Sequence, residues 1–563
     1  MLKHCGIRNR KADYPTTHTS FYKSRAPFIG AFGFFMLYFS TLYDIIIKKE
    51  GSVTMFARIN SMGLFGVDSY MVGVEVDYGQ GLPRVDLVGL PDAAVNESRN
   101  RVRSAIKNSG YSFPSSRITI NLSPADIRKE GPVYDLPILV ALLKAGQQLK
   151  CNTDDCAFIG ELSLDGLIRR VNGALPMVIR ARKSGMKRVF VPAANALESS
   201  VVDGIEVYAV ENVRQVVQFL RGEEELTPVR FDSVNETKNH APMPDFKDVM
   251  GQQEAKFALE IAAAGGHNVI MVGPPGSGKS MLAKRLPSIL PDMTFEESLQ
   301  TTELYSIAGV LPEGVSLITE RPFRAPHHTV SPAGLSGGGA IPRPGEISLS
   351  HNGVLFLDEL PEFSRIAMEV LRQPIEDSKI TISRANASIT YPCSAMVVCA
   401  MNPCPCGYYG HPKRDCTCPP GSARRYLSRV SGPMLDRIDI HIEVPPVDFE
   451  KLSSKIPSEP SSEIKKRVNA ARKIQQERLK GSGISCNAKM DPAMTREFCR
   501  PTPQAMAMLE NVFEKLDFSA RAYDKILRVA RTAADLEGSL NIEPSHIAQA
   551  VQFRSLDRKL WGR

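Results

Sequence analysis

One short stretch of the chain has the residue types and the spacing of a loop that binds phosphate. The stretch is Gly273-Pro274-Pro275-Gly276-Ser277-Gly278-Lys279-Ser280, which fits the pattern G-x-x-x-x-G-K-S. The apolar run 268–272 before it predicts a strand, and a helix should follow. In that setting backbone N–H groups surround the phosphates, Lys279 neutralises their charge and Ser280 binds Mg²⁺. The sequence therefore predicts a site for ATP and Mg²⁺.

A pair of acidic residues supplies the second part that such a site needs. Residues 354–357 are apolar and predict a buried strand, and Asp358 and Glu359 follow directly. Ligands of open α/β sheets bind at the carboxyl ends of the strands. We therefore expect Asp358 to hold Mg²⁺, directly or through water, and Glu359 to polarise the attacking water. Simple solvation of two acidic residues is the alternative, and the phosphate loop earlier in the chain disfavours it.

Three further polar residues complete the predicted ATPase site. An apolar strand over 394–399 leads to Asn402, whose side chain could orient the water near the γ-phosphate. The segment 432–439 resembles the one that carries the arginine finger of ring ATPases, so Arg437 would reach the nucleotide of a neighbouring subunit. Ser519-Ala520-Arg521 resembles a motif that contacts the nucleotide in cis. Either arginine alone is more often a surface ion-pair partner, but their order relative to the other motifs favours a functional role.

Four of the eleven cysteines form a cluster with the pattern C-x-C-x₉-C-x-C, namely Cys404, Cys406, Cys416 and Cys418. Two thiolate pairs on tight turns can close a tetrahedral Zn²⁺ site with no position left for water, so the predicted metal is structural. His411 is an alternative ligand. The residues between the pairs are aromatic and basic, a combination found on surfaces that face nucleic acid.

Three features bear on the macromolecule that such an ATPase would act on. Residues 379–391 alternate as a β-hairpin with Arg384 at the tip, which is either a contact to DNA phosphate or a solvated turn residue. Residues 463–480 predict a helix with seven basic side chains, for which a solvated face is the commoner explanation. The Gly- and Pro-rich stretch 323–339 contains His327 and His328, and we expect it to form a structural or substrate-contacting loop rather than a metal site.

Residues 55–225 predict a compact α+β domain. Alternation over 70–78 and 117–122 indicates strands, whereas 92–108 and 135–149 have helical spacing. Residues 130–135 and 160–173 resemble the stretches of the Lon proteolytic domain that carry its serine and lysine. Here the two positions fall on Val133 and Leu175, which offer neither a hydroxyl nor an amine. The resemblance therefore implies a Lon-like domain without a catalytic dyad, and we do not expect proteolysis.

The first 54 residues differ from the rest of the chain. An uncharged run over 26–43 only just reaches the length of a membrane-spanning helix. Met55 lies directly before the first strand-like segment of the following domain and could be its initiator methionine. The codons of residues 49–51, just upstream, can form a ribosome-binding sequence. We expect that the gene start was placed too early and that the protein begins at Met55. A weak hydrophobic segment over 26–47 is the alternative, and only in that case would a membrane be a partner.

The order of these motifs, with the segments 322–328 and 523–532, resembles that of the magnesium-chelatase-like AAA+ ATPases, and among them the YifB/ComM competence subfamily. The resemblance implies an α/β protein with three parts. Residues 55–225 would form an S5/Lon-protease-like α+β domain, and 226–448 an AAA+ P-loop α/β motor with a cysteine-rich insert at 404–418. Residues 449–563 would form a helical insert and a C-terminal helical lid domain.

Charge alone says little about partners. The chain carries a net charge of +8, but residues 1–54 contribute eight basic and three acidic residues to it. The family resemblance implies a cytoplasmic ATP-driven ring, a homo-hexamer that acts on DNA as a helicase or branch-migration factor in recombination of incoming DNA. The alternative is a chaperone-like motor that remodels a protein partner, as the magnesium chelatase motor does.

Overall fold

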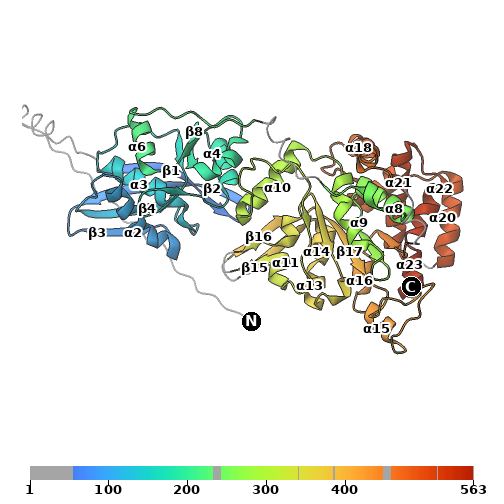
Figure 1. The fold of residues 1–563 in the computed structure, drawn as a ribbon. Helices are drawn as coiled ribbons and strands as arrows, with labels where there is room; N and C mark the ends of the chain where they lie inside the picture. The colour runs from blue at the N-terminus through green and yellow to red at the C-terminus, as the bar shows by residue number, and fades with distance from the viewer. Residues whose placement is uncertain are drawn as a thin grey trace, which may run out of the picture. The chain divides into compact units, whose positions relative to one another are not determined.

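The structure is a computed structural model, and it describes residues 55–232, 243–339, 342–384, 387–447, 458–516 and 518–561 (Figure 1). The predictions made for residues 1–54 lie outside these ranges. Within them, no helix is both long enough and apolar enough to cross a membrane.

The first domain is built on a mixed seven-stranded sheet with the strand order β3-β4-β2-β1-β5-β8-β9. β1, β2 and β4 pair antiparallel, whereas β3, β5, β8 and β9 join the sheet in parallel. The predicted alternation is confirmed in β2, where Val72, Val74 and Val76 are fully buried. The strands are β1 (Phe56–Phe65), β2 (Asp68–Gly79), β3 (Arg84–Val88), β4 (Arg117–Ser123), β5 (Cys156–Phe158), β8 (Arg188–Pro192) and β9 (Glu206–Val210).

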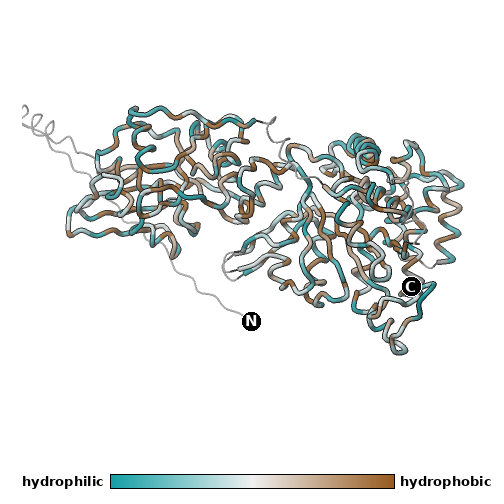
Figure 2. Tube along the Cα trace, in the orientation of Figure 1, coloured by the Kyte–Doolittle hydropathy of each residue, from teal (hydrophilic) through white to brown (hydrophobic). Residues whose placement is uncertain are grey.

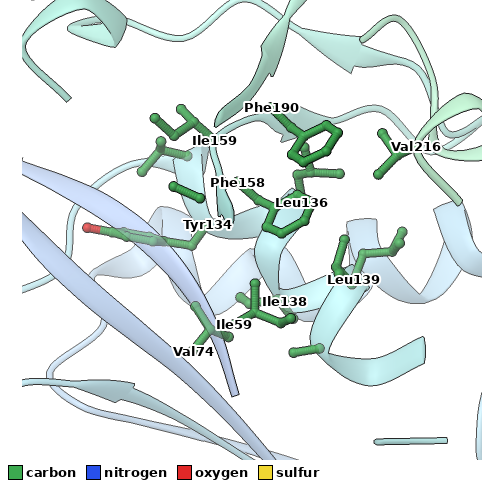
Figure 3. Close-up of a cluster of buried hydrophobic side chains, with 14 of the residues drawn as sticks. Ile59, Val74, Tyr134, Leu136, Ile138, Leu139, Phe158, Ile159, Phe190 and Val216 are labelled. Carbon is green, nitrogen blue, oxygen red and sulfur yellow. The ribbon is translucent and has the colours of Figure 1, made fainter. Parts of the chain in front are cut away.

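Helices α2 (Ala93–Asn108), α3 (Asp135–Ala145), α4 (Ala174–Lys183) and α6 (Val213–Arg221) pack around this sheet. α3 is apolar around its whole circumference, which is typical of a buried helix. In Figure 3 its residues Leu136 and Leu139 lie in one cluster with Phe158 and Phe190 of two neighbouring strands. The rings of Phe158 and Phe190 stack with their centroids 4.7 Å apart.

The two positions that correspond to the Lon serine and lysine belong to this same apolar core. Val133 lies in a short 3-10 turn, Pro132–Tyr134, and is only 8% exposed, and Leu175 in α4 is fully buried. Nucleophilic catalysis needs a hydroxyl or thiol with a base beside it. Neither buried apolar side chain can supply such a nucleophile or its base.

The motor is built on a five-stranded parallel sheet with the order β11-β14-β17-β10-β18. Every residue of the three central strands is buried, because helices cover both faces of a parallel sheet. This burial explains why these strands appear in the sequence as continuous apolar runs. The strands are β10 (Val269–Val272), β11 (Phe323–Arg324), β14 (Val354–Leu357), β17 (Met396–Met401) and β18 (Ile440–Glu443).

The C-terminal part is helical, as predicted. It includes α20 (Pro503–Leu516) and α21 (Ala520–Glu537). The last helical stretch is divided into α22 (Pro544–Gln552) and α23 (Ser555–Trp561). The break falls at Arg554, which is buried and donates to the carbonyl oxygen of Ile438 over 2.6 Å. The local pattern could not reveal this, because the acceptor lies more than a hundred residues away.

A buried ion pair ties α21 to the motor sheet. Asp439, just before β18, accepts from Lys525 Nζ at 3.0 Å and from the backbone N–H of Asn268 at 3.0 Å. Burial alone would raise the pKa of Asp439, but the charge of Lys525 and the hydrogen bond with His267 hold that pKa well below its usual value. The stabilisation is therefore present at neutral pH, and it is lost only when the pH falls through this depressed pKa.

Replacing Asp439 with Asn should lower the free energy of unfolding by about 3 kcal/mol, because it leaves the Lys525 ammonium buried without its counter-charge. The fall would be measured as a lower thermal unfolding midpoint at neutral pH. The double variant Asp439→Asn/Lys525→Met should recover part of the loss, since neither charge is then left unpaired. Equal unfolding midpoints for Asp439→Asn and the unchanged protein would contradict a stabilising pair.

Candidate nucleotide site and cysteine cluster

The predicted ATPase residues meet at one edge of the motor sheet. β10, β14 and β17 are adjacent and parallel, so their carboxyl ends lie together. β10 leads into the phosphate loop, residues 273–280, and helix α9 (Lys279–Arg285) begins within it. β14 ends before Asp358 and Glu359, and β17 ends before Asn402. The topology thus assembles three segments that are far apart in the sequence.

Two hydrogen bonds connect these segments directly. Ser280 Oγ donates to Asp358 Oδ2 over 2.6 Å, and Lys279 Nζ donates to Asn402 Oδ1 over 3.1 Å. Lys279 Nζ also donates to the carbonyl oxygens of Gly273 and Pro274, at 2.8 and 2.9 Å. Burial lowers the pKa of Lys279, and the carboxylates of Asp358 and Glu359 oppose this shift. The ammonium group is therefore anchored inside the loop where phosphate oxygens would bind.

His328 contacts the second of the acidic residues. Its Nδ1 lies 3.3 Å from Glu359 Oε2, and its ring packs edge-on against Phe363. Sequence reasoning assigned the two histidines to a structural or substrate-contacting loop and missed this contact. Their position three and four residues after the end of strand β11 (Phe323–Arg324), which pairs with β14, was the signal that could have revealed it. His328 thus helps to position the Glu359 carboxylate.

Gln252 is a second residue that the sequence did not single out. Its Nε2 donates to the carbonyl oxygens of Ser277, at 3.2 Å, and Pro445, at 2.6 Å. It lies directly before helix α8 (Gln253–Gly265), with a positive φ of 55°. The side chain therefore links the phosphate loop to the segment that follows β18.

The two arginines predicted to act on nucleotide lie elsewhere. Arg437 and Arg521 line a common cavity of about 690 Å³ between the motor sheet and the C-terminal helices. Arg437 pairs with Glu376 at 2.7 Å and donates to the carbonyl oxygen of Pro433. Residues 273–280 are not part of this cavity lining. The structure thus groups Arg521 with Arg437, whereas the sequence motifs predict that Arg437 acts on the nucleotide of a neighbouring subunit and Arg521 on the nucleotide of its own chain.

The four clustered cysteines come together as predicted. Their sulfur atoms all lie within 4.8 Å of one another, and three of the pairs are separated by 3.3, 3.5 and 3.7 Å. Tetrahedral Zn²⁺ with Zn–S bonds of about 2.3 Å places its sulfur ligands about 3.8 Å apart, so the donor set fits this metal. His411 is not a member of the described cluster, and its Nδ1 accepts from the backbone of Lys413.

The predicted hairpin is present as β15 (Lys379–Arg384) and β16 (Ala387–Pro392), an antiparallel pair. Arg384 is exposed and is the last residue of β15. The Gly-rich stretch and the residues that follow it pack against the hairpin. A Cβ on Gly338 would lie 3.2 Å from the Arg384 guanidinium, and Tyr391 Oη donates to the carbonyl oxygen of Pro342, just beyond the stretch, over 2.7 Å. Figure 1 shows the hairpin beside α11 (Pro332–Ser336) of that stretch.

The basic helix is α18 (Ser461–Arg478), which is mostly hydrophilic in Figure 2. Most of its positive charges already have partners within the protein. Arg467 pairs with Glu260 and Glu459, Arg478 pairs with Asp535, and the buried Arg472 donates to backbone carbonyls. Lys465 and Lys466 pair with Asp292 and Glu463. These contacts favour a structural role, so we do not count α18 as a DNA surface.

A parallel sheet with a phosphate loop, an acidic pair and a polar sensor at adjacent strand ends defines a P-loop ATPase. Comparison with known proteins agrees with this class. Three family models match: "Magnesium chelatase, subunit ChlI" over residues 245–452, "Subunit ChlI of Mg-chelatase" over 74–195, and "Magnesium chelatase, subunit ChlI C-terminal" over 458–554.

Full-length relatives narrow the assignment. The chain is 44% identical to YifB of Escherichia coli (strain K12) over 506 residues, which are 89% of this chain and 97% of YifB. It is 42% identical to the competence protein ComM of Haemophilus influenzae over 514 residues, or 90% and 98% of the two chains. The chain therefore belongs to the magnesium-chelatase-like AAA+ ATPases, in the subfamily of YifB and ComM.

A shorter match concerns Lon. Lon protease 2 of Bacillus subtilis is 28% identical over 176 residues, which are 29% of this chain and 31% of that protein. With the observed architecture, the predicted α/β fold class with a Lon-like component is confirmed. The family also establishes that the protein is an ATPase with ATP and Mg²⁺ as its cofactors.

Proposed function

We propose that this ATPase is a ring motor that acts on DNA, as a helicase or branch-migration factor in the recombination of incoming DNA. The observation that carries the proposal is the β15–β16 hairpin with the exposed Arg384 at its end, in the same domain as the assembled ATP site. A positioned cation of this kind suits a phosphate contact without sequence preference. The competence protein ComM, to which 90% of the chain is similar, supports a role with incoming DNA.

In this proposal each residue of the ATP site has one task. Residues 273–280 bind the phosphates, and Ser280 with Asp358 holds Mg²⁺, for which a hydroxyl and a carboxylate are suitable hard oxygen ligands. Glu359 takes the proton of the attacking water, and Asn402 orients that water. Arg437 acts on the nucleotide of a neighbouring copy in a homo-hexamer. Because Arg521 lines the same cavity, we propose that it acts there too, and not on the nucleotide of its own chain as its motif predicts.

We also propose that Cys404, Cys406, Cys416 and Cys418 hold one structural Zn²⁺ per chain. Backbone N–H groups of Cys406 and Tyr409 point at the sulfurs of Cys418 and Cys404, at 3.4 and 3.3 Å, as hydrogen bonds that orient metal ligands do. Because such a site needs reduced thiols, we place the protein in the cytoplasm.

Arg384→Ala should abolish most of the stimulation of ATP hydrolysis by single-stranded or branched DNA, while the basal rate stays within about twofold because Arg384 lies outside the ATP site. Steady-state ATPase assays with and without DNA measure this. Lys379→Ala is the matched control, since it removes an exposed positive charge at the base of the same hairpin. Equal losses in the two variants would indicate general electrostatic attraction rather than a contact at the tip.

A protein-remodelling motor is the second candidate, because all three matching family models are named for the ChlI subunit of magnesium chelatase. Such a motor would hydrolyse ATP at a rate that no DNA changes. A working basal ATPase without any DNA stimulation would therefore favour this function over the first.

A further inference from the structure

The residues 403–418, called here the cysteine insert, begin at the ATP site itself. Strand β17 ends at Met401, whose carbonyl oxygen accepts from the N–H of Gly273 over 3.2 Å. The next residue, Asn402, accepts from Lys279 Nζ. Cys404 follows two positions later and is fully buried. The first metal-ligand candidate is therefore only two residues from a side chain that contacts the phosphate-binding lysine.

The insert then turns back and packs on the phosphate loop. Gly407 donates its N–H to the carbonyl oxygen of Cys404 over 3.0 Å, which closes a tight turn. A Cβ built on Gly407 would lie 2.3 Å from Cδ and 3.0 Å from Cγ of Pro275, a residue of the phosphate loop. Gly407 also has a φ of +86°, which other residues rarely adopt. Only glycine allows the backbone of the insert to lie this close to the loop.

The turn that makes this contact is itself built around the sulfur cluster. Cys404 and Cys406 flank it on one side, and the N–H of Tyr409 is aimed at Cys404 Sγ on the other. Four thiolates within 4.8 Å of one another would repel one another without a cation between them. Without a metal the sulfurs would have to take up protons or move apart, so a bound metal would hold the shape of the turn, and its loss would release the turn from Pro275.

We infer that the metal-bound cysteine insert clamps the phosphate loop, so that the affinity for ATP depends on the metal. This inference rests on the zinc site proposed above, but it does not depend on DNA as the substrate. Pro275 belongs to the loop that holds the phosphates in both the bound state and the transition state. Loosening the phosphate loop should weaken the binding of ATP and of the transition state equally. The KM for ATP should therefore rise while kcat stays nearly unchanged.

Two glycines of the insert offer a matched test. Gly410 also has a positive φ, +76°, but a Cβ built on it meets no atom within 4 Å. Gly407→Ala and Gly410→Ala thus impose the same kind of backbone strain, and only the first pushes against Pro275. We expect both variants to retain zinc, with a KM for ATP raised about tenfold in Gly407→Ala and changed less than about twofold in Gly410→Ala. Equal KM values in the two variants would overturn the clamp.

A second measurement does not depend on how well the variants fold. Zinc is removed from the full chain with a thiol-directed mercurial and a chelator, the thiols are regenerated with dithiothreitol, and Zn²⁺ is then added back. We expect the DNA-free ATPase to lose affinity for ATP as zinc leaves, with a lower kcat as Asn402 also loosens, and to recover both on re-addition. Metal content is followed by mass spectrometry. The inference would be overturned if the purified protein contained no zinc, or if removal of zinc left the KM for ATP unchanged. A lack of DNA stimulation would contradict only the proposed function.

Discussion

Replacing Glu359 with Gln should lower the rate of ATP hydrolysis by about a hundredfold or more while ATP still binds. Glu359 follows the buried strand β14, close enough to the phosphate loop for its charge to act on Lys279. Glutamine has the same shape but cannot take a proton from the attacking water, and general-base catalysis contributes about 10²–10⁴-fold. The rate would be measured under saturating ATP, with binding measured separately by a fluorescent ATP analogue.

Glu362→Gln is the control for this variant. Glu362 lies three residues further along the same turn, is exposed, and pairs with Arg429 at 3.1 Å. Its substitution removes the same charge from the same region without touching the expected water position, so the rate should change little. A Glu359→Gln protein that hydrolyses ATP as fast as Glu362→Gln would show that another residue is the base.

The residues of the ATP site could be predicted from sequence because each is specified locally. The loop 273–280 is a contiguous motif, and Asp358 directly follows an apolar run that predicts a buried strand. Parallel strands bring their carboxyl ends together by topology, so no knowledge of side-chain packing was needed to expect Ser280 near Asp358. The cysteine cluster was also predictable from local sequence. Each pair of cysteines is only two residues apart, and one reversal of the chain between the pairs brings all four together.

Contacts that depend on packing between distant segments could not be predicted. The proximity of His328 to Glu359, and of Gly407 to Pro275, follows from how loops fold back over strand ends. The basic helix α18 is the clearest case. Its charges form a stripe in the sequence, but the partners of Arg467 and Arg478 include Glu260 and Asp535, which belong to other helices. The spacing of charged residues shows which face of a helix is basic, but it does not show which acidic residues of other elements pair with that face.

Replacing Arg437 with Ala should lower ATP hydrolysis by a factor on the order of 10³, as removal of an arginine finger does. Arg437 is only 13% exposed and is held by Glu376 on the cavity that also contains Arg521, away from the phosphate loop of its own chain. In the proposed ring, its charge would therefore stabilise the transition state in a neighbouring copy. Glu376→Gln is the control: it breaks the same ion pair but keeps the guanidinium, and it should retain most of the activity.

Action on a neighbour can be tested by mixing two inactive proteins. Chains with Arg437→Ala keep Glu359, and chains with Glu359→Gln keep Arg437, so a ring assembled from both contains junctions where both groups are intact. In a random equal mixture about a quarter of the sites would be restored, because each site needs one particular chain on each side of a head-to-tail interface. Hydrolysis should thus rise far above that of either protein alone. If Arg437 served its own chain, no junction would be complete and the mixture would stay inactive, since every chain lacks one of the two groups.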